Sequence, residues 1–336
     1  MARLMRAFFY RISKDITFKI TLIVGAGMAV FMTLLYLILQ SAIGDGVKML
    51  SGQGMLISSF SPAQNFGIAI PINLISFIYL EFSQGSIRNK IIAGHSKAKI
   101  YASLFLSGLV FAFSLLLVYV GLCTALGSIF GGFDPNGMAI AGTSSLGMLI
   151  TPAYLWRFVV LALFSYLTIV SFTVFIATVF RNMGPSIPVV MLVIMGAYLL
   201  AMIISAISSS MIEMAKEQYV EEAVAKLYEE AVQAQLAQGV ATEDVVVDTQ
   251  ALYKLVELPT VAQLAQRDDT VKTFIDVTNV LKVVDPFYGI AATETTSEGV
   301  GVIDNLTLFG GIASNTVYST IFFLAGMNIF RKRDVK

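Results

Sequence analysis

Few residues in this sequence could carry out chemistry, and their types and spacing exclude the common kinds of catalytic site. His95 is the one histidine in the chain, which excludes the H-E-x-x-H metalloprotease motif and any zinc site built from several histidines. Cys123 is the one cysteine, so the chain forms no internal disulfide. It lies in an apolar run with no histidine near it in sequence, and we interpret it as a packing residue rather than a nucleophile.

Two further motifs are incomplete or absent. The stretch Ile43-Gly44-Asp45-Gly46 matches part of an intramembrane aspartyl motif, but Ala42 stands where that motif needs a glycine. No second aspartate within an apolar segment completes a catalytic pair, so we expect a turn here. The pattern G-x-x-x-x-G-K-[ST] is absent, which excludes ATP binding by a P-loop. We therefore expect no catalytic residue, no metal site and no cofactor in this chain, and we expect that it is not an enzyme.

The composition indicates what the sequence builds instead. Of its 336 residues, 57% are hydrophobic and 13% are charged, whereas soluble domains carry about 25% charged residues. A helix of about 20 apolar residues can cross a bilayer. We expect an all-α, polytopic membrane protein with six transmembrane helices, of which the second is short and holds Pro71, a residue that spanning helices tolerate. The predicted spans are residues 20–39, 65–80, 100–122, 155–180, 186–208 and 306–330.

A seventh weakly apolar segment, residues 137–153, is not counted, because the basic residues argue against it. Lys and Arg concentrate on the cytoplasmic side of membrane proteins. With six spans, 14 of the 22 basic residues fall on one face of the membrane. These are Arg3, Arg6, Arg11, Lys14, Lys19, Arg88, Lys90, Lys97, Lys99, Arg181, Arg331, Lys332, Arg333 and Lys336. We therefore expect a multi-pass protein of the plasma membrane, here a bacterial cell membrane, with both termini in the cytoplasm.

The segment before the first span alternates apolar and basic residues. Leu4, Phe8 and Ile12 recur at helical spacing with basic residues between them, which predicts a short N-terminal helix in the lipid interface. A basic flank without fixed structure is the alternative. The apolar run that follows is longer than a signal-peptide core, so we expect no cleavable signal.

Ionisable residues inside spanning helices usually mark ion or proton pathways, and the predicted spans hold almost none. Glu81 lies at the inner end of the second span and Arg157 at the outer end of the fourth, where we expect both to stay hydrated. This pattern argues against proton-coupled transport. It does not exclude a sodium site built from carbonyls and hydroxyls, because such a site needs no charged side chain.

Residues 209–305 form a large hydrophilic segment, which six spans place outside the cell, between the parts 1–208 and 306–336. It holds seventeen Asp and Glu against six Lys and Arg. Helical spacing predicts a helix over 212–238 that continues the fifth span, and shorter helices after Pro259, where Thr260 and Gln263 match a capping box, and over 271–284. We expect a mostly helical acidic domain. Its charge either attracts a cationic substrate or reflects only the ordinary acidity of a soluble outer segment.

The connection after the second span carries the most informative motif. It reads Glu81-Phe-Ser-Gln-Gly85-Ser-Ile-Arg88-Asn89-Lys90-Ile-Ile-Ala-Gly94-His95-Ser96-Lys97. Ile87, Ile91 and Ile92 predict one apolar edge of a short amphipathic helix, and the charged residues between them stay polar.

This loop resembles the first cytoplasmic loop of the permeases of type-2 ATP-binding-cassette (ABC) exporters. Their pattern is a Glu that ends the second span, then Gly, a small residue, Ile or Leu, a basic residue, Asn, and later Gly-x-Ser-Arg/Lys. The matching residues are Glu81, Gly85, Ile87, Arg88, Asn89, Gly94, Ser96 and Lys97. The ending Gly326-Met-Asn-Ile-Phe-Arg-Lys-Arg-Asp334 resembles the close of these subunits, and the predicted architecture is similar to theirs along the whole membrane part.

The resemblance implies that residues 83–99, with Ile91 on the apolar edge, form a coupling loop that docks on cytosolic ABC ATPase subunits. Those partners would bind ATP and Mg, and a second permease copy or homologue would complete an exporter that works by alternating access. Glu81 would fix the helix by pairing with Arg88 or a neighbouring helix. Membrane lipid is a further expected partner, and nucleic acid is not.

The cargo stays open among peptides, drugs and lipids, because residues 209–305 are larger than the corresponding insertion of minimal family members. The alternative function is a membrane-anchored assembly or sensory protein whose outer domain binds a partner.

Overall fold

The structure is a computed structural model of the 336-residue chain. It describes residues 6–7, 10, 14, 16–43, 51–60, 66–133, 139–141, 148–150, 152–237, 252–253, 256, 259, 261–269, 271–273, 294–295, 300–302 and 305–332. These residues form two compact units, unit 1 (residues 1–201 with 282–336) and unit 2 (residues 202–281). Most of the predicted N-terminal interfacial helix and the end of the C-terminal tail lie outside the described residues.

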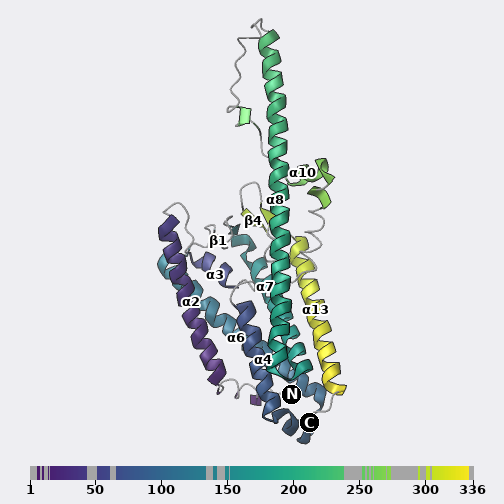
Figure 1. Ribbon diagram of the computed structural model, residues 1–336. Helices are drawn as coiled ribbons and strands as arrows, with labels where there is room; N and C mark the ends of the chain where they lie inside the picture. Colours follow the sequence, from purple (N-terminus) through teal and green to yellow (C-terminus); the bar gives the residue numbers. More distant parts are fainter. Residues whose placement is uncertain are drawn as a thin grey trace. The chain divides into compact units, whose positions relative to one another are not determined.

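Unit 1 is built mainly from long apolar helices (Figure 1). Four helical stretches are long and apolar enough to cross a membrane: Phe18–Ile38, Lys97–Gly131, Trp156–Phe180 and Leu308–Lys332. Two shorter apolar stretches, Ala69–Ser83 and Met183–Ala197, accompany them. The helices of this unit are α2 (Ile16–Ile43), α3 (Gly52–Phe60), α4 (Phe66–Ser83), α5 (Ser86–Ile92), α6 (Lys97–Gly131), α7 (Pro152–Phe180), the first part of α8 (Met183–Ala237) and α13 (Asn305–Lys332). The expectation of a helical protein with several potential membrane-spanning helices is confirmed at this level.

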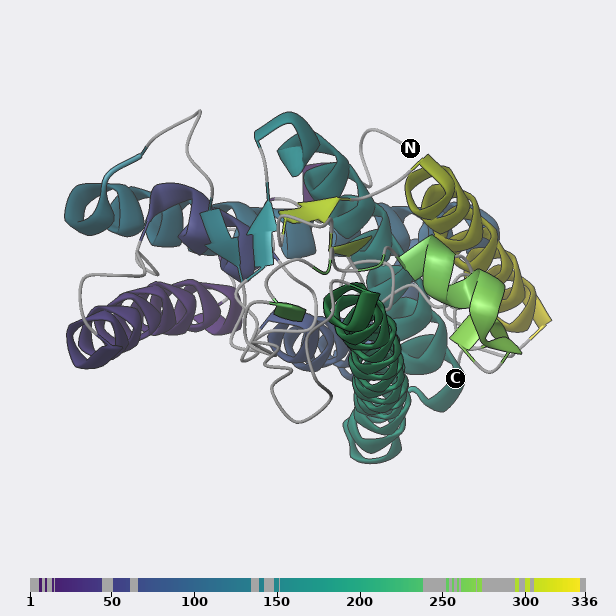
Figure 2. The ribbon, with the colours of Figure 1, turned by 90° about the horizontal axis from the view of Figure 1, so that it is seen from above.

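The all-α prediction needs one correction, because unit 1 also contains a small sheet (Figure 2). Its strand order is β1-β2-β4-β3, with β1 and β2 antiparallel, β2 and β4 parallel, and β3 and β4 antiparallel. The strands are β1 (Ala139–Ala141), β2 (Met148–Ile150), β3 (Glu294–Thr295) and β4 (Val300–Val302). Strands of two or three residues are too short to show an alternating pattern, and β3 and β4 lie in the segment 209–305, which was predicted to be mostly helical. The described residues between 139 and 150 are strands, so they provide no seventh spanning helix.

Two pairs of helices in unit 1 are joined by the same polar arrangement, which we call the Asn–Thr clasp. Thr168 on α7 donates its hydroxyl to Oδ1 of Asn315 on α13 at 2.7 Å, and the Asn315 amide donates to the Gly311 carbonyl at 2.8 Å. Thr21 on α2 donates to Oδ1 of Asn73 on α4 at 2.6 Å, and the Asn73 amide donates to the Ala69 carbonyl one turn earlier at 2.8 Å.

Each clasp satisfies the asparagine amide within its own helix and leaves its oxygen for the neighbouring helix. Hydrogen bonds between apolar helices in a membrane contribute about 0.6–2 kcal/mol each.

Close approach of the backbones accompanies the α7–α13 clasp. A Cβ at Gly311 would collide with a terminal methyl group of Leu161, so a larger residue at this position would require the Leu161 side chain to shift. Further along, Phe322 packs against Phe172 and Phe175, with ring centroids 5.1 and 5.9 Å apart. Helix α13 is therefore fixed to α7 along most of its length.

Unit 2 contains the remainder of α8 and the short helix α10 (Val261–Arg267). Arg267 places its guanidinium 4.8 Å from the Tyr219 ring centroid and 3.6 Å from the Glu222 carboxylate. Two predictions are confirmed here: α8 is one helix of 55 residues that continues past the predicted fifth span, and a short helix follows Pro259. Of the predicted helix 271–284, only residues 271–273 are described, and Thr260 lies outside the described residues.

The Asn–Thr clasp of α7 and α13 can be tested by Thr168→Val, which removes the hydroxyl and keeps the shape of the side chain. We expect the free energy of unfolding in detergent micelles to fall by about 1 kcal/mol, because Asn315 loses its donor across the helix pair. Thr316→Val is the matched control, since the exposed Thr316 hydroxyl donates only to the Ile312 carbonyl of its own helix. An equal loss of stability in both variants would contradict the assignment.

Candidate functional site

The segment that was predicted to form a coupling loop contains α5, a helix of seven residues between α4 and α6. The chain leaves α4 through Gly85, whose φ of 66° lies in the left-handed region that favours glycine. Backbone bonds hold this turn, from the Gln84 N–H to the Leu80 carbonyl at 3.1 Å and from the Asn89 N–H to the Gly85 carbonyl at 3.0 Å. Gly85 thus has a definite role, the sharp change of direction between α4 and α5.

Helix α5 ends in a Schellman motif at Gly94, whose φ is +82°. The His95 N–H bonds to the Lys90 carbonyl at 3.2 Å, and the Gly94 N–H bonds to the Ile91 carbonyl at 2.9 Å. Directly afterwards the Ser96 hydroxyl accepts a hydrogen bond from the Lys99 N–H and caps the start of α6. The Gly-x-Ser part of the motif therefore ends one helix and begins the next.

The carboxylate of Glu81, near the end of α4, joins α5 to the bundle. Its Oε2 accepts from the Lys90 ammonium at 2.7 Å and from the Ser86 hydroxyl. The prediction that Glu81 stays hydrated is wrong: its side chain is 0% exposed, because α5 folds over it, whereas Lys90 is 18% exposed. Displacing α5 would leave this buried carboxylate without its cation, so the contact favours the observed position of α5.

Glu81 was expected to pair with Arg88 or with a neighbouring helix, and its partners in the structure are instead two other residues of the helix that carries Arg88. The contacts come from Ser86 and Lys90 of α5, and Arg88 is exposed. Sequence reasoning missed Ser86 and Lys90 as partners of Glu81, because they can reach its carboxylate only if the chain reverses direction at Gly85. A glycine between the two helices was the signal that could have indicated this reversal.

Helix α5 has one face in the bundle and one face outside. Ile87 is 1% exposed and Ile91 packs against the same core. Ile92, in contrast, is 75% exposed and shares the outer face with Arg88 and Asn89. The three isoleucines were predicted to form one apolar edge, and the structure divides them between the two faces, because residues 87 and 91 are one turn apart whereas residue 92 is rotated about 100° further.

Several chain segments meet at the end of unit 1 that carries α5. The Phe330 ring, near the end of α13, lies 6.2 Å from the Phe82 ring and 5.9 Å from the Tyr101 ring, measured between centroids. Arg181, in the turn between α7 and α8, lies 5.6 Å from the Phe82 ring centroid. The Lys97 ammonium donates to the Arg331 carbonyl at 3.3 Å. The turn at residue 181 and the end of α13 thus both contact the loop 81–99.

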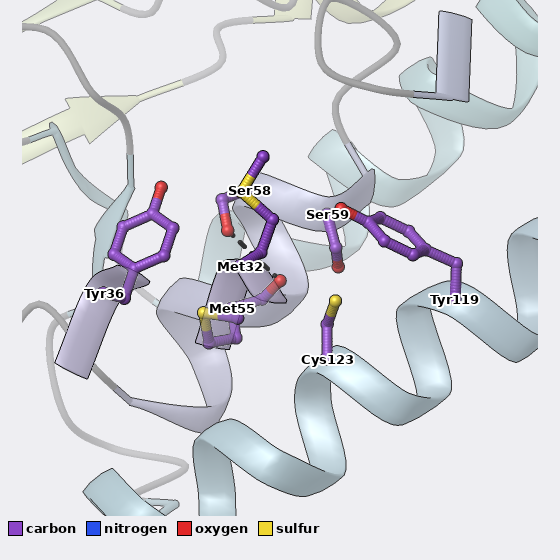
Figure 3. A pocket seen from close by; sticks show the side chains of 7 residues that line it. All are labelled: Met32, Tyr36, Met55, Ser58, Ser59, Tyr119 and Cys123. Atoms are coloured by element: carbon purple, nitrogen blue, oxygen red, sulfur yellow. Dashed lines mark hydrogen bonds between the residues drawn. The ribbon is translucent and has the colours of Figure 1, made fainter. Parts of the chain in front are cut away.

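A small cavity lies elsewhere in unit 1, between α2, α3 and α6 (Figure 3). Its volume of about 10 Å³ admits roughly one water molecule. Cys123 faces this cavity from α6 and is fully buried, in keeping with its interpretation as a packing residue. The lining residues are Met32, Tyr36, Met55, Ser58, Ser59, Tyr119 and Cys123. The cavity is too small for a peptide, drug or lipid.

Within the part of the chain that the structure describes, no group of three or more His, Cys, Asp and Glu side chains could hold a metal ion. Comparison of the chain with models of protein families, with curated proteins and with solved structures yields no match.

The left-handed glycines around α5 lead to a further test. In Gly94→Ala the Cβ meets open space, so we expect only the backbone penalty of about 1–2 kcal/mol, seen as a lower free energy of unfolding or as faster amide exchange in α5. Gly94→Asn should lose less, because asparagine tolerates this conformation better. Gly121→Ala is the control, since Gly121 also faces open space but lies inside α6, and alanine favours helices. A Gly94→Ala variant as stable as Gly121→Ala would contradict the Schellman assignment.

Proposed function

We propose that this chain is the membrane-spanning permease subunit of an ATP-driven exporter of the type-2 ABC class. The observation that carries the proposal is the position of α5, a short helix held to the bundle on one face and open on the other. Its open face presents Arg88, Asn89 and the apolar Ile92. An apolar side chain beside a cation and an amide is suited to a groove on a protein partner, where aromatic, aliphatic and Arg contacts contribute most of the binding energy.

The same residues carry the resemblance to the permease family. Gly85, Gly94 and Ser96 have backbone or capping roles that explain why the pattern needs these residue types. Glu81 has a buried ion-pair role, which explains a carboxylate at the end of the preceding helix. The matched residues therefore have structural roles in one helix–turn–helix–turn–helix unit. This common role supports the proposal more than the match of the separate residue types does.

The proposed topology has six spans with both termini in the cytoplasm. Besides the four long apolar stretches, α4 and the first part of α8 supply the two shorter ones. Two observations support an even number of crossings: the start of α2 and the end of α13 lie at the same end of unit 1 (Figure 1), and the loop 81–99, the turn at residue 181 and the end of α13 are in contact. These are the segments that hold most of the basic residues, which favours this end as the cytoplasmic one.

In this proposal the chain binds no nucleotide. ATP and Mg belong to cytosolic ATPase subunits, which move the α5 helices of two permease chains when they close. That movement opens the bundle toward the outside, and residues 209–305 lie at the outer mouth. The cargo class stays open among peptides, drugs and lipids.

A second function is favoured by the compactness of unit 2. Residues 202–281 pack with one another as a separate unit, with Leu264 and Val271 buried. Such a unit suits a membrane-anchored assembly or sensory protein that binds a partner outside the cell. A native complex that contains an ATPase favours the exporter, and a stable complex without any ATPase favours the second function.

Docking through α5 can be tested by Arg88→Glu, which reverses the charge on the open face. We expect at least about a tenfold loss of the ATPase that co-purifies with the chain, since a reversed charge at an interface costs several kcal/mol. The chain itself should stay folded, because Arg88 is exposed. Lys332→Glu is the control, as Lys332 is also exposed and lies at the end of α13 outside the helix α5. Unchanged co-purification in Arg88→Glu would remove the main support for the proposal.

The topology has its own test in a Cys123→Ala background, labelled with a membrane-impermeant thiol reagent. Gln84→Cys and Asp334→Cys should resist labelling in intact cells, because both positions are proposed to face the cytoplasm. Glu243→Cys should react within minutes, and all three should react after the cells are opened. Labelling of position 334 from outside would contradict the six-span arrangement.

A further inference from the structure

We propose that Lys90 and Ser86 are positioning residues that fix the angle of α5 against α4 through Glu81, so that binding the partner and transmitting its movement depend on different residues of one short helix. The part of this inference that concerns transmission rests on the proposed function. The part that concerns the angle of α5 does not.

The length of α5 shows why such positioning is needed. A helix of seven residues is far shorter than the 12–15 residues that are marginally stable alone in water. Its helical state and its direction must therefore come from contacts with the rest of the chain. The contacts on its inner face are the burial of Ile87, the ion pair of Lys90 with Glu81, and the hydrogen bond of Ser86 to the same carboxylate.

The polar contacts of Ser86 and Lys90 converge on one carboxylate of α4. Ser86 lies at the first residue of α5 and Lys90 one turn later, so two points along the helix are fixed to Glu81 Oε2. Two points define a direction, whereas a single contact would let the helix pivot. The preceding turns of α4 are held in the core by Leu74, Phe77 and Ile78, which are all buried. A displacement of α5 is therefore transmitted to α4.

The start of α6 is fixed to a different helix. Lys97 donates to the Arg331 carbonyl of α13, and Tyr101 packs on Phe330 and directly over Gly326, where a Cβ would collide with the tyrosine hydroxyl. Gly94 lies between these two attachments. The geometry therefore pairs α5 with α4 on one side of Gly94, and α6 with α13 on the other.

The separation of roles follows from the two faces of α5. Arg88, Asn89 and Ile92 point outward and are available to a partner. Lys90 and Ser86 point inward to a carboxylate that is fully buried, so they cannot contribute much contact area to a partner. Changing the inner residues should alter how movement passes to α4, while the surface that a partner recognises stays unchanged.

The test compares Lys90→Met, which keeps the length of the side chain and removes its charge, with Lys90→Arg, which keeps the charge. Hydrogen–deuterium exchange of the full chain in lipid nanodiscs reports on α5 directly. We expect exchange in residues 86–95 to become about tenfold faster in Lys90→Met, about threefold faster in Ser86→Ala, and to return close to the original rate in Lys90→Arg. Lys99→Met is the control, because Lys99 is exposed on the first turn of α6, and it should leave α5 unchanged.

The second readout uses the complex with its ATPase. In Lys90→Met we expect the ATPase to co-purify at the original level. The original chain changes the ATP hydrolysis rate of the ATPase on binding it, and we expect Lys90→Met to retain at most about one-fifth of that change. Arg88→Glu should show the opposite pattern and lose co-purification. A loss of co-purification in Lys90→Met equal to that in Arg88→Glu would overturn the separation of roles.

The two readouts distinguish the failure of this inference from the failure of the proposed function. If the original chain purifies without an ATPase, the exporter proposal fails, and the exchange experiment still decides whether Lys90 and Ser86 position α5. Unchanged exchange in Lys90→Met overturns the positioning role whatever partner the chain has. Should Lys90→Met not fold, exchange in α5 is measured instead in the milder variant Ser86→Ala and in the double variant Glu81→Gln/Lys90→Gln, which removes both charges. Exchange at the original rate in both variants would overturn the inference.

Discussion

An apolar environment offers no water to polar groups, and this constraint determines the polar contacts within the described helices of unit 1. Backbone groups are satisfied by forming helices, and many serine and threonine hydroxyls donate to a carbonyl three or four residues earlier in their own helix. The asparagines inside the helices face a larger problem, because an amide has both donors and acceptors. The two clasps solve it in the same way, with the amide nitrogen bonded within the helix and the oxygen bonded to a threonine of the neighbour. Satisfying the asparagine oxygen therefore contributes to the pairing of these helices.

The buried carboxylate of Glu81 follows the same constraint at a higher energetic cost. An ionised carboxylate without water needs a cation and hydrogen-bond donors nearby. The chain provides them by reversing direction at Gly85 and returning Ser86 and Lys90 to the end of α4. Neutralising this carboxylate thus contributes, together with the turn at Gly85 and the burial of Ile87, to the position of the short helix between α4 and α6.

The sequence predicted well what depends on local composition and failed where distant residues meet. Apolar stretches of sufficient length predicted the long helices, and the lack of a breaker after the fifth predicted span predicted the continuous α8. The burial of Glu81 was not predictable from its position at a span end, because it depends on residues that fold back over it. Helical spacing alone grouped Ile92 with Ile87 and Ile91, although the face toward the bundle includes only the latter two.

The small sheet shows the same limit. Its strands hold two or three residues each, and β2 pairs with a strand about 150 residues later in the chain. Neither strand length nor local pattern could have indicated that pairing. For the site, the residues with backbone roles, Gly85, Gly94 and Ser96, could be recognised as a pattern, but their roles became clear only from the φ angles and caps.

The caps at the two ends of α5 have an evolutionary consequence. Two left-handed glycines and a serine cap define where the helix begins and ends, and Ile87 and Glu81 define where it lies. The outward side chains at positions 88, 89 and 92 are therefore not needed to hold the helix in place. Substitutions there can accumulate at little cost in stability, while those at the inner positions cannot. A duplicated copy of such a chain could therefore change the surface that α5 presents by altering these three positions, with the packing of unit 1 left intact.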